Sequence, residues 1–363
     1  MRDDLLKLAP MQWLRFLPAV LLVAGASAAA QQLCEVNGES VDTSNGNSTR
    51  GKTGLMRCRD ARGLPQREQE IRDGAFVGVE RFFHPNGKVR EEHARNERGN
   101  KHGVAKEYAA DGSVLLEATY QDGRQVGLAR SFHPGGALKR ATYREPAGSE
   151  QAYVEFTSRG QLARLRCGPR PLLAPAADDA RLCGFAGPAD VELFDASGQV
   201  RTRLRYLEGK PVRSEHLHAN GQPAVTEELD GPRRVEQRFT ADGKLQREQV
   251  WADGQLASER SYYLNGQPRS SSEWQRSADR ALRVNREFHD NGQLASEGTW
   301  LLVRGRSQAI GTHAQFAPEG HKVRETEYDD QGLAKRHRAW GRDGELVQDD
   351  EVFPDGSRKA FSR

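Results

Sequence analysis

The chain has 363 residues, a formal net charge of +3 and a mean hydropathy of -0.79. Hydrophobic residues make up 36% and charged residues 29%, too little apolar material for a thick, two-sided core in a chain of this length. The near balance of charges, without a block of Lys or Arg, argues against a nucleic-acid binder.

The N-terminal segment, residues 1–30, has the pattern of a secretory signal peptide. The apolar run Phe16–Ala30 is short for a membrane span, and Ala28 and Ala30 satisfy the small-x-small rule for cleavage after Ala30. Acidic residues close to Met1 fit a basic leader poorly, and a start at Met11 would give a better one. We therefore expect an exported protein, either periplasmic or secreted.

Residues 31–71 contain no repeat, and their polar stretch NGESVDTSNGNSTRGKTG predicts a loop region. In an oxidising compartment the four cysteines of the chain favour disulfides. Sequence proximity favours Cys34–Cys58 and Cys167–Cys183, although four cysteines permit three pairings. Closely spaced cysteine pairs of the kind that bind zinc do not occur, so no metal is expected.

From residue 72 onward one short phrase recurs along the chain. An aromatic residue stands four positions before a glycine, as in Phe83/Gly87 and Phe288/Gly292, and Asn or Asp often precedes that glycine. Asn-Gly and Asp-Gly predict type I′ hairpin turns. A second turn lies between these, so turns follow at intervals of roughly 12 residues, which leaves strands of about five residues in an antiparallel meander.

The spacing of the phrase also predicts which side chains share a face. Phe288, Leu294 and Trp300 are six residues apart, so all three point the same way if the hairpin keeps a regular register. The intervening Arg, Glu, Gln and Ser residues then face the other side. The expected apolar stripe includes the tryptophans Trp251, Trp274, Trp300 and Trp340. The alternative is that these rings form an exposed platform for sugar or lipid.

The repeats fall into two blocks, residues 72–166 and residues 185–363. Between them, residues 167–184 are rich in Pro and Ala and bracketed by cysteines, which indicates a disulfide-closed insertion. Shorter interruptions begin at Gln275 and Leu301, and insertions in repeat arrays often line one functional edge, so these are candidate contact loops. The expected fold is all-β, an elongated antiparallel meander of tandem hairpins in a single twisted sheet.

The repeat unit resembles the MORN repeat variant. The resemblance rests on DGAFVGVERFFHPNGKVREE, NKHGVAKEYAADGSVLLEATY and DGRQVGLARSFHPGGALKRATY, in which Gly78, Gly103 and Gly127 fill the family's glycine position before the aromatic. In the second block that glycine is mostly lost. The family includes YwqK-type antitoxin-like proteins, and the resemblance implies an elongated sheet of hairpins that is used mainly to bind other proteins.

The residue types that could carry chemistry are scattered. His84, His133 and His289 reuse one repeat position beside the aromatic, which indicates a structural role at strand ends. The HLH stretch places two imidazoles, His216 and His218, on one strand face, a weak metal signal. The remaining candidates are the carboxylate pairs Glu91/Glu92 and Glu227/Glu228 and a glycosylation sequon at Asn47.

No nucleophile, phosphate-loop or metalloprotease fingerprint occurs, so we expect a protein that is not an enzyme and has no cofactor. The expected function is a non-catalytic, exported scaffold that binds a protein in the bacterial envelope; in its finer form, the partner is a toxin or effector that the scaffold neutralises. The alternative is an envelope structural module that binds lipid or peptidoglycan.

Overall fold

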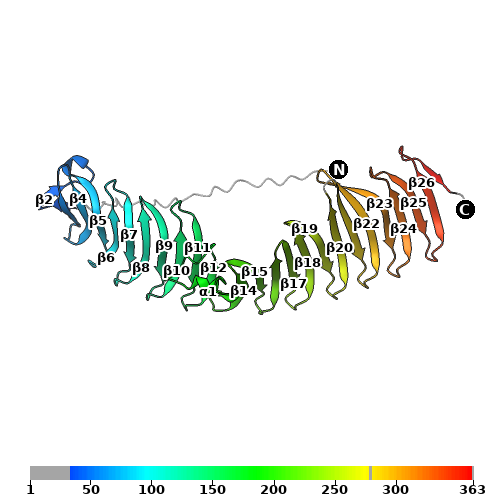
Figure 1. Ribbon diagram of the computed structural model, residues 1–363, viewed down its shortest axis with the longest axis horizontal. Coiled ribbons are helices and arrows are strands. Elements are labelled where there is room, and N and C mark those ends of the chain that lie inside the picture. Colours follow the sequence, from blue (N-terminus) through cyan, green and yellow to red (C-terminus); the bar gives the residue numbers. More distant parts are fainter. Residues whose placement is uncertain (1–32, 278–279, 362–363) are drawn as a thin grey trace, which may run out of the picture.

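The computed structural model describes residues 33–277 and 280–361, and over this range the protein is built almost wholly of antiparallel β-strands. The expected signal peptide, its cleavage after Ala30 and the Met11 start lie outside the described residues. Figure 1 shows the strands side by side in one long curved row, with β12 (Leu162–Arg166) and α1 (Asp179–Leu182) near the lowest part of the arc. The expected all-β meander of consecutive hairpins is confirmed.

The first sheet has 12 strands; β3 to β12 follow one another in chain order, and β1 lies between β3 and β2. Its strands are β1 (Leu33–Val36), β2 (Glu39–Val41), β3 (Gly54–Arg59), β4 (Pro65–Arg72), β5 (Ala75–Phe83), β6 (Val89–Arg95), β7 (Lys101–Tyr108), β8 (Val114–Gln121), β9 (Arg124–Phe132), β10 (Leu138–Arg144), β11 (Glu150–Phe156) and β12.

The second sheet has 15 strands in strict chain order. They are β13 (Ala189–Phe194), β14 (Val200–Leu207), β15 (Lys210–Leu217), β16 (Pro223–Asp230), β17 (Arg233–Phe239), β18 (Leu245–Ala252), β19 (Gln255–Tyr262), β20 (Pro268–Arg276), β21 (Ala281–Phe288), β22 (Leu294–Val303), β23 (Arg306–Phe316), β24 (Lys322–Tyr328), β25 (Ala334–Trp340), β26 (Leu346–Val352) and β27 (Arg358–Ala360). Where one continuous sheet was expected there are thus two, because the insertion after Arg166 separates β12 from β13.

Two kinds of turn join the strands. At Asp122 and Gly123 both φ angles are positive, 50° and 85°, which is the type I′ geometry. The Asn-Gly sites differ: the Gly87 N–H donates to the His84 carbonyl at 2.9 Å, and Gly87 but not Asn86 has a positive φ. This is a type I turn closed by a glycine bulge, so the type I′ prediction is wrong for this class.

The bulge also changes the expected faces. Phe288 is paired with Leu294, but the register of the two strands shifts between Glu287 and Phe288. The prediction that Phe288, Leu294 and Trp300 share one face required a regular register, and the bulge interrupts it. Arginine lies on the tryptophan face rather than only on the other one: Arg283 is directly opposite Trp300, and its guanidinium lies 5.4 Å from the ring centroid.

The segment expected to be a loop region, residues 31–71, contributes four strands and a small core. Val36, Met56 and Ile71 pack around the Cys34–Cys58 disulfide at this end of the first sheet. The loop itself is confined to the residues between β2 and β3, with one short 3₁₀ turn, η1 (Gly46–Ser48). Each of these short strands has only two or three inward-facing residues. That number is too small to produce a periodic hydrophobic pattern in the sequence.

Burial is uneven along the array. A second core joins the two sheets, with Val154 and Leu165 from the first sheet, Leu173 and Cys183 from the insertion, and Val191 from the second. Among the described residues between Ser214 and Gly298, by contrast, none is fully buried. The tryptophans of the expected stripe are half-buried, and basic side chains lie over three of them: Arg234 over Trp251, Arg283 over Trp300 and Lys322 over Trp340.

Candidate interaction surface

One row of residues crosses the first sheet from strand to strand on a single face, and we call it the floor row. Its members face each other in directly paired positions, except between Ala118 and Ala129, where the ladder is irregular. The floor row is Met56, Gln69, Glu80, His93, Ala105, Ala118, Ala129, Thr142 and Tyr153. Because the side chains change from large to small at Ala105, the surface drops over β7 to β10.

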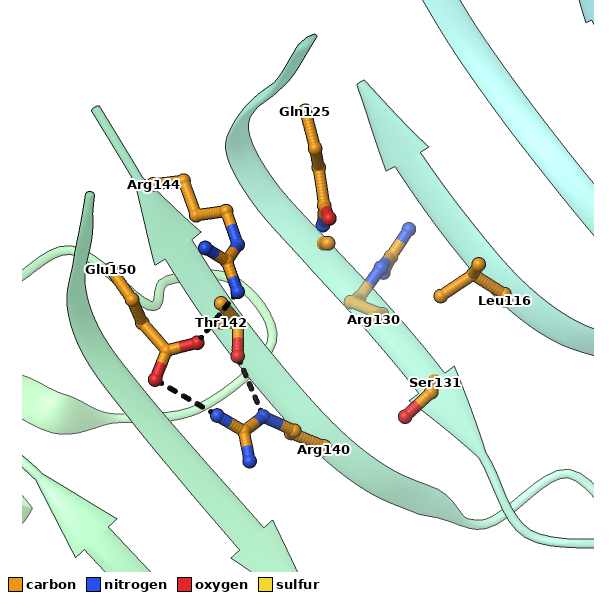
Figure 2. Close-up of a pocket in the computed structure, with 9 residues that line it drawn as sticks. Leu116, Gln125, Arg130, Ser131, Arg140, Thr142, Arg144 and Glu150 are labelled. Atoms are coloured by element: carbon orange, nitrogen blue, oxygen red, sulfur yellow. Dashed lines mark hydrogen bonds and ion pairs between the residues drawn. The ribbon is translucent and has the colours of Figure 1, made fainter. Parts of the chain in front are cut away.

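The drop forms an open hollow of about 200 Å³ over β8 to β11, which we call the arginine hollow (Figure 2). Ala129 and Thr142, both buried, lie at its base. The residues around them include Leu116, Gln125, Ser131, Arg140, Arg144 and Glu150.

The rim of the arginine hollow is held by two carboxylates of β11: Glu150 contacts both Arg140 and Arg144, and Glu155 also accepts from Arg140 Nη1. Figure 2 shows Glu150 of β11 reaching toward two arginines of β10; its Oε1 accepts from Arg140 Nη2 at 2.9 Å and its Oε2 from Arg144 Nη2 at 3.1 Å. Arg140 Nε also donates to Thr142 Oγ1 at 2.9 Å, and its guanidinium lies 4.3 Å from the centroid of the Tyr153 ring. The two guanidinium groups are therefore fixed in place at the surface.

At the other end of the floor row lies a buried ionic cluster around Glu80, which is fully buried. Arg67 Nη2 lies 2.7 Å from Glu80 Oε1, while His93 Nε2 and Arg95 Nε lie 2.9 and 2.6 Å from Oε2. Burial alone would raise the pKa of this carboxyl group, but the contacts from His93, Arg95 and Arg67 outweigh it and lower the pKa to about 2. The cluster makes this end of the row rigid and charged.

The opposite face of the first sheet carries a second row, the charge row, in which the sign of the charge alternates from strand to strand. Paired positions bring together Glu35, Arg57, Glu68, Arg81, Glu92, Lys106, Glu117 and Arg130. Arg81 Nε, for example, donates to Glu92 Oε2 at 2.5 Å. The same repeat position continues the row in the second sheet with Glu192, Arg203 and Glu215.

The repeated histidines have a structural role at the turns. His84 Nε2 lies 2.8 Å from the carbonyl oxygen of Tyr108, one hairpin further along, and because a carbonyl can only accept, the imidazole N–H donates. The same bond joins His133 to Phe156, His289 to Phe316 and His218 to Phe239. We call these bonds the turn staples.

Asparagines of the Asn-Gly turns add a second set of turn staples. Asn86 Nδ2 donates to the Ala110 carbonyl at 2.6 Å, and the corresponding donors at Asn220, Asn265 and Asn291 reach the next hairpin at 2.7 Å. Each turn is therefore bonded to the next by side chains of the recurring phrase. The sequence identified these positions but not their acceptors, which lie about two strands away.

The other candidates from the sequence are not brought into shared sites. His216 Nδ1 lies 3.2 Å from Thr202 Oγ1, whereas His218 belongs to a turn staple, and no group of three metal-ligating side chains occurs among the described residues. Glu92 belongs to the charge row, whereas Glu91 lies on the floor-row face, where its Oε1 contacts Lys101 Nζ at 2.6 Å.

Glu227 and Glu228 likewise point to different partners, Arg234 and Arg213 respectively, on opposite faces of β16. Asn47 is exposed in η1. The cysteines are bonded in the pairs that proximity favours, Cys34–Cys58 and Cys167–Cys183.

The two interruptions that were expected to be contact loops belong largely to strands. The segment from Leu301 continues β22 to Val303, turns at Arg304 and Gly305 with positive φ at both, and returns as β23. The segment from Gln275 lies partly in β20 and returns as β21. The extra length from Leu301 therefore lengthens the two strands and does not make a loop.

The sequence patterns did not indicate a functional role for Arg140, Arg144 and Glu150 of the arginine hollow. They also did not indicate the buried cluster of Glu80 and His93. A signal for the charge row was present, since the residue two positions before the turn aromatic is Arg81, Lys106, Arg130, Arg260, Arg286 or Arg338 in six hairpins. The floor row lies three positions before that aromatic and reads Glu80, Ala105 and Ala129 on β5, β7 and β9. The change from large to small side chains along the floor row can be recognised only when it is known which strands are neighbours.

Comparison with known proteins supports the repeat and little more. The family model described as MORN repeat variant matches residues 76–93, 101–122 and 284–301. Each match covers one hairpin, namely β5–β6, β7–β8 and β21–β22. No curated protein matches the chain. Within the described residues, no helix is long and apolar enough to cross a membrane.

Two solved structures show weak similarity to the chain. One is a mutant of S. aureus TarM in complex with fondaparinux, α-GlcNAc-glycerol and UDP, with 12% identity over 27% of this chain and 19% of that one, at a TM-score of 0.20. The other is the TcdB2–TccC3–Cdc42 structure, with 10% identity over 84% of this chain and 18% of that one, at a TM-score of 0.19. The chain spans less than a fifth of either, and these scores are too low to support a common fold.

Proposed function

We propose that the protein is a non-catalytic scaffold that binds a protein partner through the floor-row face of its first sheet, in the periplasm or outside the cell. The observation that carries the proposal is the arginine hollow. It lies on a broad, single-layer sheet, has a buried base, and has two guanidinium groups held at its rim by Glu150.

The size of the hollow favours a protein partner over a small molecule. Small-molecule sites usually enclose roughly 300–1,000 Å³ and surround their ligand. The arginine hollow, at about 200 Å³, is open and suits a single large side chain, the way an interface anchor residue fills a pocket. Glu150 and Glu155 already balance the charges of the two rim arginines, so these arginines favour a neighbour of that anchor that accepts hydrogen bonds.

Two further observations support the proposal in general terms, without identifying a partner. MORN repeats are consistent with a repeat-based binding scaffold, and the two disulfides fit an oxidising compartment. In the finer form of the proposal the partner is a toxin or effector that this surface masks. That form is tested by mixing the purified chain with the products of neighbouring genes and measuring whether a complex forms and toxicity is lost.

The test of the binding surface fills the hollow without changing the strand. In Ala129→Gln the new side chain projects into the arginine hollow, and the floor row already accepts glutamine at Gln69. The matched control is Arg124→Gln on the same strand, an exposed residue that does not line the hollow. Each full-length protein is immobilised and exposed to envelope extract, and retained proteins are quantified by mass spectrometry.

We expect wild type and Arg124→Gln to retain the same partner and Ala129→Gln to retain about tenfold less, a difference of about 1.4 kcal/mol in binding. Circular dichroism establishes that all three proteins are folded. Equal retention by all three would remove the arginine hollow from the proposal. Sedimentation of the chain with liposomes or peptidoglycan, without any retained protein, would favour the envelope structural module instead.

A further inference from the structure

The row of strands is interrupted between the two sheets, and the residues that connect the sheets fill the gap. β12 and β13 are neighbours along the row, yet they belong to separate sheets with no backbone ladder between them. The space beside them holds residues 167–188, which we call the wedge. It contains α1 and is closed on itself by the Cys167–Cys183 disulfide.

The wedge packs against both sheets. Leu173 and Cys183 are fully buried in one cluster with Val154 and Leu165 of the first sheet and Tyr206 of the second. No other hydrophobic core cluster of the described residues draws on both sheets. The relative placement of the sheets therefore depends on how well the wedge keeps its shape.

The wedge is bonded rigidly to the second sheet. The Gly209 N–H donates to the Cys183 carbonyl at 2.8 Å, and the Glu208 N–H donates to the Gly184 carbonyl at 3.1 Å. The backbones approach so closely that a Cβ on Gly184 would lie 2.5 Å from the Tyr206 carbonyl oxygen. Both bonds attach at or beside Cys183, one end of the disulfide.

The other half of the wedge follows directly from the first sheet. Cys167 comes immediately after Arg166, the last residue of β12. The buried Asp179 accepts from the backbone N–H groups of Leu172 and Leu173, at 2.6 and 3.0 Å, which ties the loop to α1. The disulfide thus joins a residue at the end of one sheet to a residue bonded to the other.

At the turn edge, one side-chain hydrogen bond joins the two sheets within the part of the chain that the structure describes: Arg159 Nη1 donates to the Ser197 carbonyl at 2.5 Å. It occupies the place of a turn staple. A single contact of this kind leaves the sheets free to swing about it if the wedge loosens, because hinges need only a few residues that absorb the change.

We propose that the Cys167–Cys183 disulfide is a redox-sensitive lock that sets the angle between the two sheets. An external dithiol would open it: one thiolate attacks the sulfur of Cys167, which is a partly buried residue whereas Cys183 is fully buried, and Cys183 leaves as a thiolate that takes up a proton. The second thiolate of the reagent then displaces Cys167, which is protonated in turn. Two electrons pass from the dithiol to the protein, and the reagent ends as a disulfide.

The test measures shape and needs no partner, so it is independent of the proposed function. Two non-cysteine amino acids that carry fluorophores replace Lys139 in the first sheet and Lys244 in the second, and single-molecule energy transfer reports the distance between them. The proteins compared are the oxidised chain, the double variant Cys167→Ser/Cys183→Ser, and the matched control Cys34→Ser/Cys58→Ser, which opens the disulfide at the far end of the first sheet.

We expect one narrow distance distribution for the oxidised chain and for the matched control, and loss of that single distribution in the junction variant. Small-angle X-ray scattering should show the same change in the maximum dimension. If the junction variant folds poorly, adding tris(2-carboxyethyl)phosphine to the wild-type chain and to the matched control supplies the comparison. A distribution that stays narrow after reduction, or reduction that melts the strands of both sheets together, would overturn the proposal.

Discussion

Glu80 shows how a single-layer sheet can hold a charge out of water. Its carboxylate is fully buried, although no second layer covers the strand, because Arg67, His93 and Arg95 close over it. A buried carboxylate with several partners is costly to expose and more costly to leave unpaired. The cluster therefore ties β4, β5 and β6 together at the end of the floor row.

Replacing Glu80 by Gln should lower the stability at neutral pH by about 3 kcal/mol, because the partners of the carboxylate lose their counter-charge. The pKa of Glu80 is lowered from 4.5 to about 2. Its contribution is therefore complete above about pH 4.5 and is lost as the pH falls toward 2.

Urea denaturation from pH 7 to pH 2 checks both statements about Glu80. The wild-type free energy of unfolding should fall more steeply below pH 4.5 than that of Glu80→Gln, and the difference between the two proteins should shrink with acid. The exposed pair Glu97–Arg72 supplies the control, since Glu97→Gln should change stability little at any pH. Parallel pH profiles for wild type and Glu80→Gln would contradict the assignment.

Gly184 is the residue where the wedge tolerates no side chain. Its φ is +72°, and an added Cβ would meet backbone atoms of Tyr206 that cannot move aside. Gly160 has a similar φ of +77°, but nothing lies within 4 Å of an added Cβ. The two glycines therefore separate the cost of the backbone conformation from the cost of the clash.

We expect Gly160→Ala to lose about 1–2 kcal/mol for the left-handed conformation alone. Gly184→Ala should lose about 1–3 kcal/mol more, because overpacking is added. Thermal and urea unfolding of the two variants measure the difference. Equal losses would mean that the junction can shift to admit a methyl group.

The turn staples act on whole hairpins. Each bond runs from a turn side chain to the backbone of the hairpin that follows, so it fixes the spacing of neighbouring units along one edge. The imidazole N–H donates to a carbonyl whether or not the other nitrogen is protonated, so these bonds do not depend on the charge of the ring.

His133→Ala should lower the free energy of unfolding by about 1 kcal/mol, the usual net value of such a bond. Combined replacement of His84, His133, His218 and His289 should lower it by about 4 kcal/mol, because the sites are far apart and independent. His102→Ala is the control, since that imidazole is exposed and makes no turn staple. Losses no larger than that of the control would show that the staples contribute nothing measurable.

The charge row makes its own prediction for strand pairing. In Glu92→Lys the new cation stands between Arg81 and Lys106, so three positive charges meet in adjacent strands. We expect a loss of about 1–2 kcal/mol, reduced by added salt, because the groups are half-exposed and screened. Glu97→Lys at an exposed turn is the matched control. A loss that does not respond to salt would point to packing instead of charge.

The turns and strands of the repeat blocks were readable from the sequence because each turn carries its own glycine. Three features were not. The first is the face of Phe288, since a one-residue bulge inverts parity and leaves no mark in the spacing. The second is the set of strands in residues 31–71. The third is the arginine hollow, whose shape comes from Ala129 and Thr142 on neighbouring strands.

The whole molecule is unevenly stabilised. Both core clusters involve the first sheet or the junction, whereas β16 to β21 hold no fully buried residue among those the structure describes. In repeat arrays each unit is stabilised mainly by its neighbours, so weakly buried units can open while the others remain folded.

Hydrogen–deuterium exchange should therefore be fastest in β16 to β21 and slowest in the strands around the two cores. Mass spectrometry of peptides along the oxidised chain measures this directly. Peptides of β4 to β6 serve as the internal reference, because these strands contain the buried residues Gln69, Glu80 and His93. Uniform exchange along both sheets would mean that the array unfolds as one unit.

The turn staples have a direction, since the donor always belongs to the earlier hairpin and the acceptor to the later one. A hairpin copied in tandem would thus find an acceptor ahead of it and offer one to the hairpin behind. Gene duplication can lengthen such an array one unit at a time, without any compensating substitution, which gives evolution a simple way to adjust the reach of the surface.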